Sequence, residues 1–474
     1  MGGMAQAMTL HPDRLLPAEP GVRDIARRLY DEVKDLPILS PHGHVPPAWI
    51  ADDIPFKNAT ELLITPDHYV NRIMHANGVE LSTLGVPVGT ELTDEQSRTA
   101  WRTFCEHWSD YNGTAMRYWM QDQLVGIFGI DVRPSAETAD QIYDAINAKL
   151  ATPEMRPRAL MDSFDITFIA TTDDPCDSLD KHEQIAQDSS FTRRVVPTFR
   201  PDKYLEPGRR DWNDLVNALG EAAGMEISNL ADYTAAMENR RAFFKQHGAV
   251  STDHSHADLG TVTPDAVEAT KLFELARRNE ASPEQCDQLR RHLLTDQVRM
   301  ATEDGLTMTL HPAVVRGHDA EATATYGADV GNDIPMRLEV TRALQPVLNA
   351  FGNHPNLNLV LFTLDEDSFS REIAPLAGWY RSLYIGVPWW FIDAPESIMR
   401  FKQATTEMAG FSRLSGMIDD TRAFCSIPAR HDMSRRLDCA HLAGLVAQHR
   451  LDEDEAAETA VKLVVDNPKK VFKL

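Results

Sequence analysis

The chain has 474 residues, of which 43% are apolar. The chain is longer than one minimal hydrophobic core requires, and it suits a barrel of about 250 residues with insertions. Lys and Arg number 47 against 71 Asp and Glu, which gives a net charge of -24. So acidic a chain is a poor partner for nucleic acids or anionic membranes. A small anionic substrate remains compatible if arginines gather locally inside the acidic shell.

The cysteines and the N-terminal segment bear on the cellular compartment. The N-terminal segment MGGMAQAMTLHPDRLL lacks the basic start and long apolar run of a signal peptide. No stretch approaches the roughly 20 apolar residues of a membrane span. The cysteines are scattered, odd in number and without a CxxC pair, as is typical of reduced thiols. We therefore expect a soluble cytoplasmic protein. The cysteines are Cys105, Cys176, Cys286, Cys425 and Cys439.

Eight short apolar runs recur along the chain, and polar residues follow nearly all of them. Segments with a helical pattern lie between the runs, for example at 180–190, 265–280 and 395–410, and the tail 452–467 is also helical in pattern. Alternating strands and helices predict a parallel sheet. The runs are LPILSPHGH, DITFIATTDDP, RRVVPTFRPD, GAVSTDHSH, LTMTLHPAV, LNLVLFTLDED, RSLYIGVPWW and LSGMIDDTRAF.

Eight repeats of a strand and a helix predict an α/β fold of the (β/α)8 TIM-barrel type. An open, doubly wound sheet would show similar runs. We prefer the barrel because in a barrel the polar ends of all strands converge on one mouth. An open sheet would gather only a few of them at its switch point.

The predicted domain organisation departs from the repeat in one place. Residues 77–160 contain two aromatic, amphipathic helical patterns and are interpreted as a helical insertion after the first strand. Such an insertion often covers a barrel mouth. We expect an N-terminal helical segment at 1–34, the first strand and its loop and helix at 35–76, the remaining barrel at 161–430, and C-terminal helices at 431–474.

Two histidines at the end of the first predicted strand suggest a metal site. His42 and His44 are two residues apart, so on a strand both side chains face the same way. Neutral imidazoles suit Zn²⁺ or a similar divalent ion. The pair alone is weak evidence for a metal site, since His254 and His256 form a second such pair. Two hydrogen-bonded polar residues in a loop would give the same pattern. One aspartate of MIDDTR on the neighbouring last strand should point inward, and with Asp420 the three predict a mononuclear site.

Arginines at two strand ends predict a small anionic substrate. Arg200 follows the third run and Arg422 the eighth, and arginine binds carboxylates or phosphates bidentately. Salt bridges to Asp202 or Asp420 are the alternative. No phosphate-binding glycine loop occurs, which disfavours a nucleotide.

Further polar and aromatic residues lie at the ends of other runs. Asp253 and His311 supply acid–base groups on the fourth and fifth runs. Trp389 and Trp390 offer a ring for stacking on a sugar face, although core packing explains either one equally well.

An ordered series of motifs resembles the uronate isomerases, which are amidohydrolase-superfamily members with a (β/α)8 barrel. The similarity extends from about Leu36 to the final NPKKVFKL. The motifs are SPHGHVPPAWIADD, DHYVNRIMHANGV, TTDDPCDSL, FRPDK, TDH, LHPAVVR, DVGND, PWWFID and GMIDDTRAF.

The resemblance implies the activity and assigns residues to the site. Family members interconvert D-glucuronate with D-fructuronate and D-galacturonate with D-tagaturonate. The extra His256 departs from some relatives and has no clear role. By position, the implied metal ligands are His42, His44 and Asp420, the substrate contacts are Arg200, Asp253, His311, Arg422 and Trp389, and the catalytic groups are Asp420, Tyr69, His311 and Arg422.

Aldose–ketose chemistry through a cis-enediol fits these residues. The proton at C2 would leave to Asp420 or Tyr69 and return at C1, and a Tyr base needs a pKa well below its ordinary value of about 10. A hydride shift is the other route. A metal-dependent amidohydrolase or lactonase and a sugar-acid binding module are competing functions. We expect one divalent ion, Zn²⁺ first, a uronate substrate and a homo-oligomer.

Overall fold

The computed structural model describes residues 7–474. Seven short parallel strands form its framework, each three to five residues long and almost entirely buried. Strands covered on both faces explain why the apolar runs are continuous rather than alternating. The strands are β1 (Ile38–Ser40), β2 (Ile166–Ala170), β3 (Arg194–Val196), β4 (Ser251–His254), β5 (Thr307–Leu310), β8 (Leu359–Leu361) and β9 (Leu383–Ile385).

The seven strands follow one another in chain order. Strands β1, β2 and β3 pair in parallel, and so do β4, β5, β8 and β9. Phe199, just after β3, joins the two groups through bridges to Asp173 and to Thr252 of β4. The predicted parallel sheet is therefore confirmed.

The eighth apolar run does not form a regular strand. Within residues 414–422 only Leu414 makes a strand-like bridge, to Ile385 of β9. Gly416 has a φ of 82°, and a Cβ on it would collide with the ring of Pro468. The C-terminal segment thus packs closely against Gly416, and the run forms no regular strand, so the prediction of a strand over this run is wrong.

This run nevertheless lies against the chain that follows β1. The amide of His44 donates to the carbonyl of Thr421 over 3.0 Å, and the amide of Asp420 donates to the carbonyl of His42 over 3.3 Å. The residues after the first strand and those after the last run are therefore held side by side by backbone hydrogen bonds.

Helices connect successive strands on the outside of the sheet. The helices predicted at 180–190, 265–280 and 395–410 are confirmed as α9, α12 and α17. A small antiparallel hairpin of β6 (Val314–Val315) and β7 (Ile334–Pro335) follows β5. The connecting helices are α9 (Asp180–Gln187), α10 (Trp212–Ala223), α11 (Leu230–Gln246), α12 (Ala266–Arg277), α13 (Pro283–Asp304), α14 (Ala320–Tyr326), α15 (Gln345–Phe351), α16 (Ala374–Ala377) and α17 (Pro395–Ala409).

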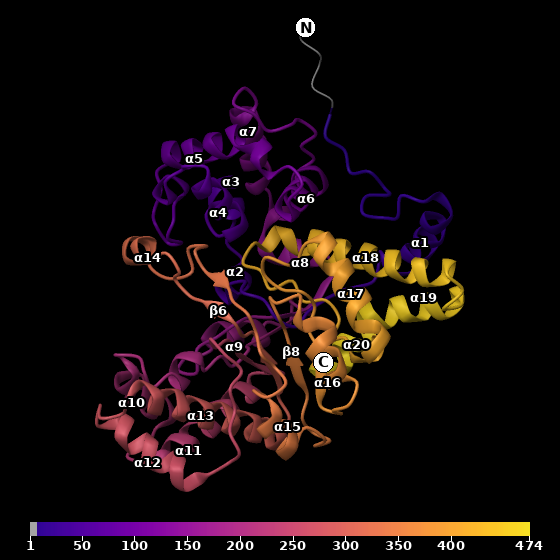
Figure 1. The fold of residues 1–474 in the computed structure, drawn as a ribbon. Helices are drawn as coiled ribbons and strands as arrows, with labels where there is room; N and C mark the ends of the chain where they lie inside the picture. Colours follow the sequence, from indigo (N-terminus) through magenta and orange to yellow (C-terminus); the bar gives the residue numbers. More distant parts are fainter. Residues whose placement is uncertain (1–6) are drawn as a thin grey trace.

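The chain between β1 and β2 forms a separate group of helices. Figure 1 shows the violet helices α3 to α7 gathered on one side of the strands and α10 to α13 on the opposite side. The violet group surrounds a largely aromatic and aliphatic core that includes Trp101, Phe104 and Trp119. The helices are α2 (Pro47–Asp52), α3 (Ala59–Leu63), α4 (His68–Ala76), α5 (Asp94–Glu106), α6 (Ala115–Asp122), α7 (Ala139–Leu150) and α8 (Pro157–Ser163).

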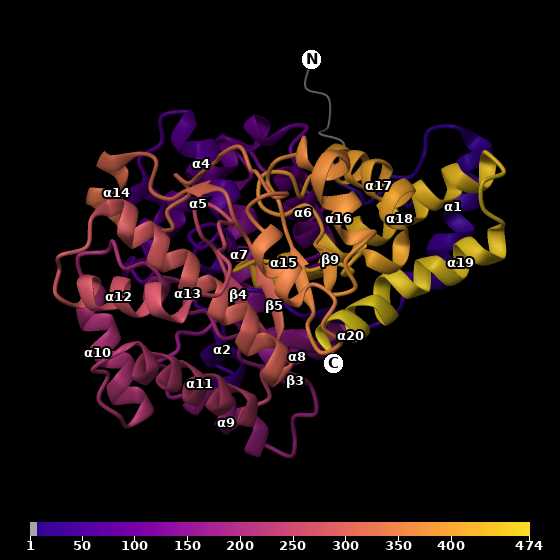
Figure 2. The same cartoon turned by 60° about the horizontal axis from the view of Figure 1, so that its bottom comes forward.

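Helices from both ends of the chain pack together. Helix α1 (Pro20–Val33) lies against α18 (Ile427–Ala447) and α19 (Glu453–Val461), as Figure 2 shows. The helix predicted at 452–467 is confirmed, since α19 continues through a π-helical turn into α20 (Asn467–Phe472). Helix α18 is buried over most of its length. None of the described helices is both long and apolar enough to cross a membrane.

Candidate active site

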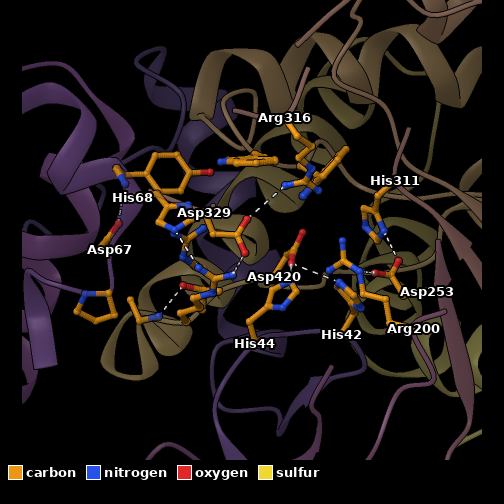
Figure 3. A pocket seen from close by; sticks show the side chains of 18 of the residues that line it. His42, His44, Asp67, His68, Arg200, Asp253, His311, Arg316, Asp329 and Asp420 are labelled. Carbon is orange, nitrogen blue, oxygen red and sulfur yellow. Dashed lines mark hydrogen bonds and ion pairs between the residues drawn. The ribbon is translucent and has the colours of Figure 1, made fainter. Parts of the chain in front are cut away.

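A cavity of about 410 Å³ opens beside the carboxyl ends of the strands, and Figure 3 shows how its polar side chains converge. Every residue predicted for the site lines this cavity. The residues predicted from the sequence therefore lie together in one cavity, while their roles remain predictions. The nine are His42, His44, Tyr69, Arg200, Asp253, His311, Trp389, Asp420 and Arg422.

Asp420 holds both histidines of the HxH pair. Its Oδ1 lies 3.3 Å from Nε2 of His42 and 2.9 Å from Nε2 of His44. Burial alone would raise the pKa of Asp420, but the imidazoles of His42 and His44 lower it well below its ordinary value. Asp419 contacts His431 of α18 over 3.2 Å instead. Of the two aspartates in MIDDTR, Asp420 is therefore the one in the cavity.

A second buried pair joins the ends of β4 and β5. Nδ1 of His311 lies 2.6 Å from Oδ1 of Asp253, and the hydroxyl of Thr309 donates to the same oxygen over 2.7 Å. Nε of Arg200 lies 3.4 Å from the other oxygen of Asp253 and 2.8 Å from Asp202. Burial opposes the effect, but His311 and Arg200 hold the pKa of Asp253 well below its ordinary value.

The imidazole of His311 is fixed by rings on three sides. It stacks on His42 and Phe362 with centroid distances of 4.8 Å and 4.2 Å, and it meets Trp389 in a T-shaped arrangement with the centroids 4.6 Å apart. Phe362 reaches this position because Gly386 faces it, where a Cβ would collide with the phenyl ring. The orientation of His311 is thus set by packing as well as by Asp253.

The donor set for a metal differs slightly from the predicted one. Ligand atoms of His42, His311 and Asp420 all lie within 4.8 Å of one another. His311 thus stands in this set where the sequence predicted His44. His44 instead contacts Oδ1 of Asp420. Nε2 of His311 is buried and has no hydrogen-bond partner among residues 7–474. An imidazole held at one nitrogen by a carboxylate and free at the other is typical of a metal ligand.

Arg422 is held by partners from two other segments. It donates to Nε2 of His68 over 3.0 Å and to Oδ2 of Asp329 over 2.8 Å. Burial, assisted by Arg422, lowers the pKa of His68 to about 4. His68 is therefore neutral near pH 7, and its Nε2 accepts a hydrogen bond from the guanidinium of Arg422. Arg316 lies 3.7 Å from Asp329 and adds a second guanidinium to this wall.

Tyr69 has surroundings that oppose the role of a base. Its hydroxyl lies 2.6 Å from both carboxylate oxygens of Asp393, which also binds Arg430 over 2.9 Å. Burial, followed by the charge of Asp393, raises the pKa of Tyr69 well above its ordinary value. A tyrosine base requires the opposite shift. Trp119 from the inserted helices packs edge-on against Tyr69 at 5.1 Å.

Sequence reasoning missed several residues that line the cavity. Most of them lie inside motifs that were noticed but given no role: His68 precedes Tyr69 in DHYVNR, Arg316 ends LHPAVVR, and Asp329 opens DVGND. A charged or ionisable residue within a recognised motif was therefore a usable signal. Arg209 also lines the cavity but lies in no such motif.

Comparisons with known proteins agree over nearly the whole chain. The sequence model of the family described as glucuronate isomerase matches residues 21–472. The uronate isomerase of Cutibacterium acnes is 63% identical over 467 residues, which cover 98% of this chain and 99% of the relative. The uronate isomerase of Xanthomonas axonopodis pv. citri is 48% identical over 472 residues, covering 99% and 100%.

The solved structures support the same relationship. The crystal structure of glucuronate isomerase from Caulobacter crescentus has a TM-score of 0.96 at 42% identity and covers 99% of this chain and 98% of that chain. A uronate isomerase from Thermotoga maritima gives a TM-score of 0.91 at 27% identity, covering 98% and 100%. The resemblance drawn from the motifs is confirmed, and the chain belongs to the glucuronate isomerase family.

Proposed function

We propose that this protein is an aldose–ketose isomerase that interconverts D-glucuronate with D-fructuronate and D-galacturonate with D-tagaturonate. The observation that carries the proposal is one cavity that combines a buried carboxylate between two imidazoles with arginines from two distant segments of the chain. The family membership supports the same reaction, since its relatives are named uronate isomerases.

Arg200 and Arg422 bind the anionic end and the hydroxyls of the open-chain substrate in this proposal. Both ion pairs of Arg200 use Nε, and a guanidinium has five N–H donors. Its terminal nitrogens therefore remain available for a carboxylate. Arg422 is held rigidly by its two partners, which places its charge without further ordering of the side chain.

Asp420 is the base that we propose for the proton at C2. Both imidazoles contact Oδ1, so Oδ2 can face the substrate, and the lowered pKa keeps the carboxylate ionised near neutral pH. Arg422 lines the same cavity and stabilises the oxyanion of a cis-enediolate by hydrogen bonding, whereas His311 keeps the lone pair of Nε2 for the ion. The proton then returns at C1, and the proton of the C2 hydroxyl passes to the oxygen on C1, which leaves the ketone at C2. Tyr69 positions Asp393 and Arg430 and does not act as the base.

We propose one divalent ion in this cavity, with Zn²⁺ as the first candidate. His42, His311 and Asp420 would hold it, with His44 on the same carboxylate. The two imidazoles and a carboxylate suit Zn²⁺, and the unpartnered Nε2 of His311 fits a ligand. When bound, the ion supplies positive charge that polarises substrate oxygens.

We also propose that the strands close into the (β/α)8 barrel expected for the family. The backbone hydrogen bonds of His44 with Thr421 and of Asp420 with His42 support this closure, as does the bridge from Leu414 to β9. The domain division at residues 34, 76, 160 and 430, the cytoplasmic location and the homo-oligomer remain predictions.

A turnover experiment in deuterated water tests the proposed function. Purified protein is given D-glucuronate or D-galacturonate, and ketose formation and deuterium at the migrating position are followed by NMR, with and without chelator. Ketose that carries solvent deuterium supports the isomerase and its enediol route. Ketose with the original hydrogen fully retained would replace that route with a hydride shift. A hydrolase or a binding module would form no ketose at all.

A further inference from the structure

A second cluster of metal-ligand side chains lies behind Arg200. Asp202 opens the 3-10 turn Asp202–Leu205, His254 ends β4, and His256 follows two residues later. One ligand atom from each lies within 4.8 Å of the others. His254 is 1% exposed and His256 is 5% exposed. The cluster is thus built by residues that the isomerase reaction leaves unused.

Each histidine of this cluster has one nitrogen engaged and one free. Nδ1 of His256 lies 2.6 Å from Oε1 of Glu206, and Nε2 of His254 lies 3.2 Å from the hydroxyl of Thr252. The other nitrogens, Nε2 of His256 and Nδ1 of His254, are buried and have no hydrogen-bond partner within the described chain. Nε2 of His256 lies 3.9 Å from Oδ1 of Asp202.

The tautomers of His254 and His256 leave two unprotonated nitrogens with no hydrogen-bond donor among the described residues. A carboxylate only accepts, so Nδ1 of His256 donates to Glu206 and a neutral ring presents a lone pair at Nε2. His254 presents a lone pair at Nδ1 in the tautomer that donates to Thr252. The two lone pairs then face the carboxylate of Asp202, whose Oδ1 already accepts from the amide of Ser255. Buried polar atoms in native structures are nearly always paired, and a cation would pair both nitrogens at once while the carboxylate balances its charge.

We propose that Asp202, His254 and His256 form a second metal site, distinct from the one at His42 and Asp420. Two imidazoles and one carboxylate suit a divalent first-row transition ion such as Zn²⁺, with water completing the coordination. Glu206 orients His256 as outer-shell carboxylates do for metal-bound histidines. The side chain of Asp202 is 20% exposed, which gives the ion a route to the site.

The second ion has a positioning role in this proposal. Oδ2 of Asp202 binds Nε of Arg200 over 2.8 Å, while Oδ1 accepts from the amide of Ser255 over 2.9 Å. An ion on Asp202 and the two histidines ties the turn after β3 to the end of β4 and keeps Arg200 in place. The site does not depend on the isomerase reaction, so its test does not require turnover.

Counting bound metal in matched variants tests the proposal. Wild type and the variants His256→Gln, His42→Gln and His75→Gln are stripped with chelator, dialysed against ZnCl₂ and analysed for zinc per chain. We expect about two ions in wild type, about one in His256→Gln and about one in His42→Gln. His75 is exposed on α4, so His75→Gln controls for loosely bound zinc and should keep about two.

Three results decide between the two sites. An unchanged zinc content in His256→Gln overturns the second site. Zinc that falls from about one ion in wild type to none in His256→Gln keeps the second site and overturns the first. Since His256→Gln could also disturb folding, His254→Asn and the zinc-dependent rise in Tm are measured in parallel. Zinc should raise Tm less in both variants than in wild type, and equal rises would also overturn the site.

Discussion

Nδ1 of His311 lies 2.6 Å from Oδ1 of Asp253, and both side chains are buried. The carboxylate fixes which nitrogen of His311 carries the proton and leaves Nε2 toward the cluster with His42 and Asp420. The stacking on His42 and Phe362 holds the same ring orientation. The protein itself therefore positions His311 before any metal or substrate binds.

Replacing Asp253 by Asn should remove this control of the tautomer. We expect kcat and zinc affinity each to fall by about 10- to 100-fold, measured by steady-state kinetics and by equilibrium dialysis. Thr309→Val is the matched control, because its hydroxyl donates to the same carboxylate oxygen over 2.7 Å. It should cost about 1 kcal/mol of stability and little activity. Equal kinetic losses in the two variants would contradict this account.

Tyr69→Phe and Asp420→Asn separate the two candidate bases. If Asp420 takes the proton, Asp420→Asn should lower kcat by about 10²- to 10⁴-fold even when its zinc content equals that of wild type, and Tyr69→Phe should lower kcat by less than about 10-fold. Tyr69→Phe removes a donor from the buried Asp393 and should cost about 1–3 kcal/mol of unfolding free energy. Kinetics and urea unfolding measure both effects. A kcat loss in Tyr69→Phe as large as in Asp420→Asn would reverse the assignment.

The sequence predicts most of the framework because the physics involved is local. Continuous apolar runs mark strands covered on both faces, and helices of three or more turns show their own periodicity. The run expected as the eighth strand instead contains Gly416 at a φ of 82°, packed against Pro468 of the C-terminal segment. Such a contact lies between distant segments and leaves no pattern in the run itself.

The candidate site divides in the same way. His42, His44 and Asp420 were predictable because strand ends converge in parallel α/β folds. The environment of Tyr69 was not predictable, because its partner Asp393 lies 324 residues away in the sequence. Burial and this partner together raise the pKa of the phenol. The hold of Asp329 on Arg422 likewise depends on a loop whose position no periodicity encodes.

Arg422→Lys should separate charge from geometry in substrate binding. A lysine keeps the positive charge but loses the planar donors that bind His68 and Asp329 together. We expect kcat/KM for D-glucuronate to fall by about 10- to 100-fold, which corresponds to about 1.4–2.7 kcal/mol. In Arg422→Met, kcat/KM should fall further. Inhibition by a neutral aldose analogue checks the anion contact, because its affinity should change less than that of a uronate. Equal changes for both ligands would contradict it.

Gly386→Ala tests the packing that supports His311. A Cβ at this position would collide with the ring of Phe362, which stacks on His311 at 4.2 Å. We expect a loss of about 1–3 kcal/mol in unfolding free energy together with a fall in kcat. Gly444→Ala in α18 is the control, because nothing lies within 4 Å of its added Cβ. It should be neutral or stabilise by up to about 1 kcal/mol, and a neutral Gly386→Ala would show that Phe362 moves freely.

Asp173 should make stability depend on pH. It is buried just after β2 and accepts hydrogen bonds from the hydroxyl of Thr171 over 2.6 Å and the amide of Thr198 over 3.2 Å. Burial raises its pKa from 3.8 to about 7. Since the folded pKa exceeds the unfolded one, the protonated form favours the fold. This stabilisation is complete below about pH 3.8 and is lost as the pH rises through 7.

Asp173→Asn mimics the protonated acid and should escape this loss. Its unfolding free energy relative to wild type should rise between pH 5 and pH 8 by about 2–3 kcal/mol, measured by urea unfolding at both pH values. Asp287→Asn, at an exposed position on α13, controls for the removal of one negative charge from an acidic chain. A difference between Asp173→Asn and wild type that stays constant over this range would mean that Asp173 is ionised in the folded protein at pH 5. Its carboxylate would then be stabilised by more than the two hydrogen bonds from Thr171 and Thr198.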